Sequence, residues 1–238
     1  MTESVARDRL LLLFDCDGTL VDSQHIISDA MASIFREHGL PEPTIEATRG
    51  VIGLSLPIAI GALLGEPLAE RDAGMAESYR RHFHVLRSAP GFVEPLFPGA
   101  AECLARLSSR PELVLGMVTG KSRRGVRSVC AFHGLDEIFR VVRTADDCPS
   151  KPHPAMVLEC CEEARIPPAR TIVVGDTRYD MEMAAAAGAG AIGVGWGYHH
   201  EAELVAAGAS VVIDSFGDLD GAVEALALAR SSLTGAPA

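Results

Sequence analysis

Residues 10–20 read Leu-Leu-Leu-Leu-Phe-Asp-Cys-Asp-Gly-Thr-Leu, and this stretch decides the fold. Five consecutive apolar residues, 10–14, predict a strand that is buried on both faces, as in a parallel sheet. Residues i and i+2 of an extended chain point to the same side, so Asp15 and Asp17 are expected to lie together at the carboxyl end of the sheet. Open α/β sheets bind their ligands at that end, which makes the pair a candidate site.

The chemistry of two adjacent carboxylates favours phosphoryl transfer. Their mutual repulsion favours a bound cation or a shared proton. One carboxylate can attack phosphorus, and the other can carry a proton to the leaving oxygen. Gly18 lets the backbone turn sharply, so that amide groups can approach an anion. The alternative, a solvated Asp-x-Asp-Gly turn, is disfavoured by the buried strand that precedes it.

Beyond this stretch, apolar runs alternate with helical patterns. Further strands are predicted at Leu113–Val118, Phe139–Val142, Thr171–Val174, Ala191–Val194 and Val211–Ile213. Helices are predicted between them at Ala100–Leu107, Arg124–His133, Pro154–Ala164, Tyr179–Ala187 and His200–Ala207. Such alternation predicts an α/β fold with a doubly wound parallel sheet. The Ser-, Gly- and Pro-containing tail, about 231–238, is expected to fray.

The segment 23–94 breaks this alternation and shows no clear strand. Apolar residues between Ile26 and Phe35 recur at helical spacing, and a second helix is predicted over Leu68–Leu86. The Pro- and Gly-rich residues 90–99 are typical of a linker. We therefore predict a helical unit, 23–94, inserted into a sheet-containing core made of residues 1–22 and 95–238.

Three further motifs carry candidate site residues. Thr119 and Gly120 follow a predicted strand, where a hydroxyl and free amides can hold phosphate oxygens. Lys151, in Lys-Pro-His-Pro, could neutralise phosphate charge, although a surface-loop lysine is the simpler interpretation. Asp176 and Asp180 lie one helical turn apart and offer the oxygen ligands that Mg²⁺ prefers. Acidic residues capping a helix N-terminus would give the same pattern.

Composition narrows the class of protein. The 238 residues include 21 Lys plus Arg against 32 Asp plus Glu, a net charge of −11, which argues against binding nucleic acid or an anionic membrane. An apolar content of 48% predicts a globular chain. Only two of the cationic residues are lysines, Lys121 and Lys151. Because lysine is so rare here, both are candidate positions at which a compact point charge is needed.

Cysteine usage and the N-terminus both predict a cytoplasmic protein. The six cysteines form no Cys-x-x-Cys pair, so reduced and mostly buried thiols are expected. The apolar run 10–14 is too short for the core of a signal peptide. The longest uncharged stretch, 183–200, is Gly-rich and does not predict a membrane helix. Either a monomer or a homodimer is compatible with the sequence.

Taken in order, the four motifs resemble those of the haloacid dehalogenase (HAD) superfamily, in its phosphatase branch with a small helical cap inserted after the first motif. The resemblance covers nearly the whole chain. It is strongest to the phosphoglycolate phosphatase group, through Asp-x-Asp-Gly-Thr-Leu-x-Asp-Ser at 15–23. The resemblance implies a Rossmann-like core, with residues 23–94 as the α-helical cap domain.

The resemblance also implies roles for the motif residues. Asp15 would be the nucleophile, and Asp17 the general acid and base. Asp15, the backbone carbonyl of Asp17 and Asp176 would bind the cofactor Mg²⁺, and Asp180 would support the metal through its waters.

The transferring phosphoryl group is expected to be bound by Gly18, Thr119, Gly120 and Lys151. Lys121 lies outside the strict match. Substrate choice is expected to come from cap cations, first Arg49 and then Arg80 or Arg81, which could grip a carboxylate or a distal phosphate.

The implied function is Mg²⁺-dependent hydrolysis of a small phosphorylated metabolite, with 2-phosphoglycolate favoured. Dehalogenase chemistry is disfavoured because the dehalogenases of this superfamily lack the second aspartate, and Asp17 is present here. The phosphonate-cleaving relatives form a Schiff base with a cap lysine. That chemistry is also disfavoured, because residues 23–94 contain no lysine. Two alternatives stay open at this point. One is a sugar phosphomutase, and the other is a catalytically weak protein that binds a phosphorylated ligand.

Overall fold

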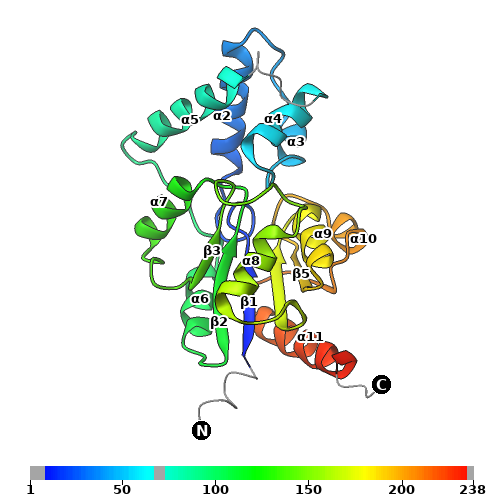
Figure 1. Cartoon of the computed structure of the whole chain (residues 1–238). Helices are drawn as coiled ribbons and strands as arrows, with labels where there is room; N and C mark the ends of the chain where they lie inside the picture. The colour runs from blue at the N-terminus through cyan, green and yellow to red at the C-terminus, as the bar shows by residue number, and fades with distance from the viewer. Residues whose placement is uncertain (1–8, 67–72, 235–238) are drawn as a thin grey trace.

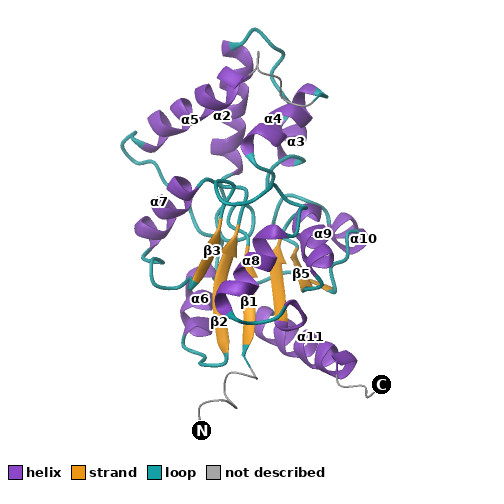
Figure 2. Ribbon diagram, viewed as in Figure 1, coloured by secondary structure: helices purple, strands orange, loops and turns teal. Residues whose placement is uncertain are grey.

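The computed structural model describes residues 9–66 and 73–234, and its centre is a six-stranded sheet (Figures 1 and 2). The strands lie in the order β3-β2-β1-β4-β5-β6, and all neighbouring pairs are parallel. The strands are β1 Leu10–Phe14, β2 Leu113–Val118, β3 Val141–Arg143, β4 Thr171–Gly175, β5 Gly190–Val194 and β6 Val211–Ile213. The prediction of a doubly wound parallel sheet is confirmed.

Helices cover both faces of the sheet. Both faces need such a cover because successive apolar side chains of β1 point to opposite faces. Leu12 and Phe14 pack on one face with α6, α7 and α11, whereas Leu11 and Leu13 pack on the other with α8, α9 and α10. The first group comprises α6 Ala100–Ser108, α7 Arg123–His133 and α11 Leu219–Thr234. The second comprises α8 Ala155–Ala164, α9 Arg178–Ala187 and α10 Glu201–Ala206.

The strand order reverses between β1 and β4. From β1 the chain builds outward through β2 to β3, then crosses to β4 on the other side of β1. The crossover leaves a crevice at the carboxyl ends of these two central strands, which is where such sheets bind ligands. The pairing of Phe14 with Val174 places the residues that follow both strands side by side at this crevice.

Helices α2 to α5 lie beyond the carboxyl ends of the strands, at the top of Figure 1. They are α2 Gln24–Glu37, α3 Ile45–Arg49, α4 Leu56–Leu64 and α5 Ala73–Arg87. Helices α2, α4 and α5 share an apolar core of their own, formed by Met31, Ile34, Phe35, Ile60, Met75 and Ala76. No strand occurs among the described residues between α2 and α5.

The two segments that join these helices to the sheet run against each other. Asp22 N–H donates to the carbonyl of Pro95 at 2.8 Å, and Phe97 N–H donates to the carbonyl of Leu20 at 2.9 Å. The expected linker at 90–99 is therefore tied to the chain that follows β1.

Several predicted elements differ from the structure in extent. The strand predicted at Phe139–Val142 is β3, which begins only at Val141, because Phe139 packs against the core from the preceding turn. The helix predicted over Leu68–Leu86 is α5, and residues 68–72 lie outside the described residues. The tail expected to fray is helical as far as Thr234, while residues 235–238 also lie outside the described part.

Three helices, α3, α4 and α11, are absent from the sequence prediction. The nine residues of α4, Leu-Pro-Ile-Ala-Ile-Gly-Ala-Leu-Leu, are all apolar, Gly or Pro, so no polar face marks a helical period. Helix α3 has only five residues, too few for a periodic pattern. Within the described residues, no helix is long and apolar enough to cross a membrane.

The packing of α6 against the sheet gives a stability test. Leu104 is fully buried between α6 and the sheet. Leu104→Ala is expected to lower the free energy of unfolding by about 2–5 kcal/mol, through lost burial and a residual cavity. Leu228→Ala removes a side chain that is 71% exposed on α11 and should change it by less than about 0.5 kcal/mol. Urea denaturation followed by circular dichroism measures both, and equal effects would contradict the assigned core.

Candidate active site

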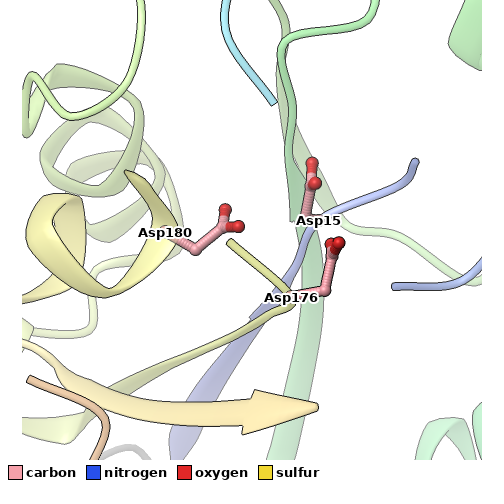
Figure 3. Close-up of side chains that lie close together, drawn as sticks. All are labelled: Asp15, Asp176 and Asp180. Carbon is pink, nitrogen blue, oxygen red and sulfur yellow. The ribbon is translucent and has the colours of Figure 1, made fainter. Parts of the chain in front are cut away.

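Three carboxylates gather where β1 and β4 end. Asp15 directly follows β1, Asp176 directly follows β4, and Asp180 lies in the first turn of α9. All three residues are fully buried, and their carboxylates turn toward a common space (Figure 3). One oxygen from each lies within 4.8 Å of the others. The structure thus brings together three of the residues predicted to hold a metal.

Lys151 is the cation buried with them. Its Nζ lies 2.8 Å from Oδ1 of Asp15 and 2.6 Å from Oδ1 of Asp180, and its side chain is fully buried. Burial alone would lower the pKa of Lys151, but the two carboxylates raise it overall, so the ammonium stays charged. When the three carboxylates are ionised, one ammonium leaves two negative charges without a partner.

Asp15 and Asp176 resist ionisation in this environment. Burial raises the pKa of Asp15 to about 7; Lys151 opposes that rise, and Asp180 adds to it. Burial, together with Asp15 and Asp180, raises the pKa of Asp176 well above its ordinary value.

The same carboxylates fit a Mg²⁺ ion. Oδ1 of Asp15 contacts only Lys151 Nζ, and the buried Oδ2 accepts no hydrogen bond from the described residues. Mg²⁺ binds carboxylate oxygens and carries the two positive charges that the cluster lacks.

Asp176 is held in place from both sides. Thr19 Oγ1 donates to its Oδ1 at 2.8 Å, and the backbone N–H of Tyr198 donates to its Oδ2 at 3.0 Å. A Cβ at either Gly18 or Gly197 would overlap the side chain of Asp176, so both positions require glycine. Gly18 also adopts a φ of +89°, which favours glycine. Of these partners, the sequence analysis identifies only Gly18.

Asp17 lies apart from the three-carboxylate cluster. Its Oδ1 accepts hydrogen bonds from Ser23 Oγ and from Lys121 Nζ, each at 2.6 Å. Asp17 also lines a cavity between the core and helices α2 to α5. This carboxylate is therefore oriented by two donors and faces the space where a substrate can sit. The contribution of its backbone carbonyl to a metal site stays a prediction.

A buried chain of charges connects Asp17 to α5. Lys121 Nζ lies 2.9 Å from Glu94 Oε1, and Arg87 Nη2 on α5 lies 2.7 Å from Glu94 Oε2. Burial alone would lower the pKa of Lys121, but Asp17 and the other nearby acidic groups raise it overall. The sequence analysis leaves Lys121 outside the motif match, although its rarity marks the position. Glu94 is missed because it lies in a stretch that is typical of a linker.

Thr119 and Gly120 follow β2, next to the start of this chain. Thr119 is buried, and its Oγ1 accepts a hydrogen bond from the backbone N–H of Lys121 at 3.1 Å. A Cβ at Gly120 would overlap the carbonyl oxygens of Gly53 and Leu54. Glycine is therefore required at Gly120 because the loop before α4 rests directly on it.

The same loop touches the core at two other points. Tyr179 Oη donates to the carbonyl of Gly50 at 2.7 Å, and the N–H of Ser55 donates to Ser150 Oγ at 2.8 Å. Ser150 immediately precedes Lys151. The loop thus contacts the second and fourth predicted motifs, and also the residue that immediately precedes the third.

The structure does not place Arg49 on the cavity. Its Nε donates to Gln24 Oε1 at 2.8 Å, and the residue is exposed. Arg81 also lies off the cavity and pairs with Glu37 at 2.6 Å. Of the arginines named from the sequence, only Arg80 contributes to the cavity wall.

Comparison with known proteins identifies the family of this chain. The profile of the family described as "Haloacid dehalogenase-like hydrolase" matches residues 12–194. The chain belongs to this family. The match spans β1 through β5, and therefore contains all four motifs.

Two curated relatives illustrate the family. The chain is 38% identical over 226 residues to a Dickeya dadantii protein named "Probable phosphatase IndB", covering 93% of this chain and 96% of the relative. It is 30% identical over 217 residues to a Haemophilus influenzae protein named "Phosphoglycolate phosphatase", covering 88% and 96% of the two chains. The predicted family and enzyme class, a HAD-like phosphatase, are confirmed by these matches.

Solved structures share the fold. A Bacteroides fragilis structure described as haloacid dehalogenase-like is 27% identical, with a TM-score of 0.77 over 89% of this chain and 99% of the other. A β-phosphoglucomutase from Clostridium difficile is 19% identical, with a TM-score of 0.79 over 94% and 99%. At that identity the second likeness concerns the fold alone.

The raised pKa of Asp15 gives a test of the metal site. Since the folded-state pKa of about 7 exceeds the ordinary value of 3.8, the metal-free protein should lose stability as the pH rises between them. Mg²⁺ binds deprotonated carboxylates, so it should stabilise the fold more at pH 8 than at pH 5.5. At a Mg²⁺ concentration about 100 times Kd, we expect Tm at pH 8 to rise by roughly 5–10 °C.

Differential scanning calorimetry with and without EDTA measures this shift. Asp176→Asn should remove most of the Mg²⁺-dependent rise. Asp214→Asn, which alters an exposed carboxylate after β6, should retain it. A Tm that is independent of Mg²⁺ at both pH values would contradict the assignment.

Proposed function

We propose that this protein is a Mg²⁺-dependent phosphatase that hydrolyses a small phosphate monoester through an aspartyl-phosphate on Asp15. One observation carries the proposal. Asp15 is fully buried beside Lys151 and Asp176, yet its Oδ2 accepts no hydrogen bond from the described residues. Oδ1 is paired with Lys151, which leaves Oδ2 available as a nucleophile.

In the first step, Asp15 attacks phosphorus. An O–P bond forms to its carboxylate as the P–O bond to the leaving alcohol breaks. Lys151 and the backbone N–H groups after β1 and β2 stabilise the charge on the phosphoryl oxygens. Bound Mg²⁺ would be held by Asp15 and Asp176, with Asp180 in support, and would supply further positive charge there. Asp17 gives its proton to the departing alkoxide.

In the second step, Asp17 acts as a base. Its ionised carboxylate takes a proton from water, and the water oxygen attacks phosphorus. The bond to Asp15 breaks, inorganic phosphate leaves, and both aspartates return to their starting states. The hydrogen bonds from Ser23 and Lys121 keep Asp17 at one position through both steps.

Residues 23–94 act in this proposal as the cap that closes over the site. The loop before α4 excludes water from the carboxylate cluster through its contacts with Gly120, Ser150 and Tyr179. Relatives named phosphoglycolate phosphatase make 2-phosphoglycolate the first ester to test.

Replacement of the nucleophile tests the reaction class. Asp15→Asn is expected to reduce phosphate release from p-nitrophenyl phosphate and 2-phosphoglycolate at least a thousandfold, because an amide cannot form the acyl phosphate. EDTA should do the same to the wild-type enzyme. Malachite-green assay of inorganic phosphate measures both. Substantial turnover by Asp15→Asn would remove the mechanism, and an isomerised sugar phosphate without phosphate release would establish a mutase.

The role of Lys121 has its own test, which depends on the leaving group. Lys121→Met removes one donor to Asp17 and should lower kcat/KM for an alkyl ester roughly tenfold to a hundredfold. For p-nitrophenyl phosphate the loss should be about threefold or less, because nitrophenolate departs without a proton. Lys121→Arg should restore part of the alkyl-ester activity. Equal losses on both esters would show that Lys121 serves only the fold.

A further inference from the structure

The cavity beside Asp17 is much larger than glycolate. Its volume is about 470 Å³, and it runs from Asp17, Gly120 and Lys121 outward between α2, α4 and α5 on one side and α7 on the other. At about 30 Å³ per water, the space equals roughly 15 waters. Glycolate, a two-carbon acid, fills the space of only a few of these waters. Pockets of about 300–1,000 Å³, by contrast, bury whole drug-sized ligands.

Alongside Arg80, His84 and Arg87, the cap side of this cavity has an extended apolar wall. Side chains from three cap helices and the loop before α4 form it: Ile27, Met31, Ile52, Leu56, Tyr79 and Phe83. Tyr79 and Phe83 lie on one stripe of α5, with ring centroids 5.5 Å apart. A carboxylate against this wall would lose its hydration without a partner, whereas a planar ring would be stabilised by contact with it.

Most cations near the cavity are already paired. Lys121 is paired with Asp17 and Glu94, and Arg87 is paired with Glu94. Arg80, which also lines the cavity, pairs with Glu77 at 3.4 Å, and both side chains are exposed.

Arg124, in the first turn of α7, differs from them. Among the described residues it forms no ion pair with a carboxylate, and its Nη2 lies 3.0 Å from Nδ1 of His84 on α5. Both residues are exposed, so they mark the solvent end of the cavity. A guanidinium with free N–H groups there can donate to a polar edge of a ligand.

We propose that the substrate is the phosphate ester of an alcohol that carries a planar ring and has about the size of a nucleoside. The phosphate lies at Asp15 and Lys151, the ring lies on the apolar wall of the cap, and its polar edge accepts hydrogen bonds from Arg124. This assignment rests on the proposed phosphatase function and specifies its substrate. In this proposal, the part of the substrate farthest from the phosphate is recognised by Arg124, and not by Arg49 as the sequence suggested.

A comparison of substrates tests the proposal. The four common nucleoside 5′-monophosphates serve as ring-bearing probes, and 2-phosphoglycolate and glycerol 3-phosphate as open-chain probes. The kcat/KM of the best nucleotide should exceed that of either open-chain ester at least tenfold. A preference for an open-chain ester, or a difference below twofold, would overturn the proposal.

Two variants locate the binding site. Ala145 lines the cavity from the core side, and Ala145→Leu should reduce the ratio of kcat/KM for the best nucleotide to that for p-nitrophenyl phosphate at least tenfold. Ala105→Leu, on an exposed position of α6, should leave that ratio unchanged. Arg124→Met should raise KM for the nucleotide about fivefold with little change in kcat. Unchanged ratios and KM in both cavity variants would contradict the site.

The two proposals fail in different ways. If no ester, p-nitrophenyl phosphate included, releases phosphate in a Mg²⁺-dependent manner, the phosphatase function itself is wrong. If release is Mg²⁺-dependent but fastest from 2-phosphoglycolate, the function stands and the ring-bearing substrate class is wrong.

Discussion

Two unbalanced negative charges, buried at the carboxyl ends of β1 and β4, constrain the rest of this structure. Asp15, Asp176 and Asp180 share one ammonium, that of Lys151, and none of the four residues is more than 1% exposed. Burying unpaired charge is costly, and the raised pKa values of Asp15 and Asp176 express that cost. The cluster becomes favourable when a divalent cation or two protons balance it, and that requirement supports the proposed metal-dependent chemistry.

The surrounding elements keep this cluster in place and dry. The reversal of strand order brings Asp15 beside Asp176, and glycines at positions 18 and 197 leave room for the Asp176 side chain. The loop before α4 lies against Gly120, so the helical insertion contacts the core next to the proposed phosphate-binding residues. Asp17 is held separately by Ser23 and Lys121, which keeps the proposed acid and base distinct from the carboxylates that fit a metal.

The sequence predicts the core of this site better than its periphery. Each central strand is a short apolar run followed at once by a polar motif, so the bounds of β2 and β6 and the gathering of the motif residues could be anticipated. Contacts such as that of Thr19 with Asp176, 157 residues away, depend on sheet order and leave no local pattern. Helix α4 is apolar all round, and Glu94 lies in a Pro- and Gly-rich stretch, so periodicity and composition conceal both. Arg49 has the chemistry expected for substrate recognition, but only the packing of α3 shows that it lies off the cavity.

Diffraction from crystals soaked in Mn²⁺, an anomalous scatterer that accepts the same oxygen ligands as Mg²⁺, tests the central claim most directly. We expect one anomalous peak per chain, within coordination distance of the carboxylate oxygens of Asp15 and Asp176 and next to Asp180. We also expect this peak to be lost in Asp176→Asn crystals soaked in the same way. An ordered carboxylate cluster without a peak, or a peak elsewhere that survives Asp176→Asn, would contradict the claim that a divalent cation balances this site.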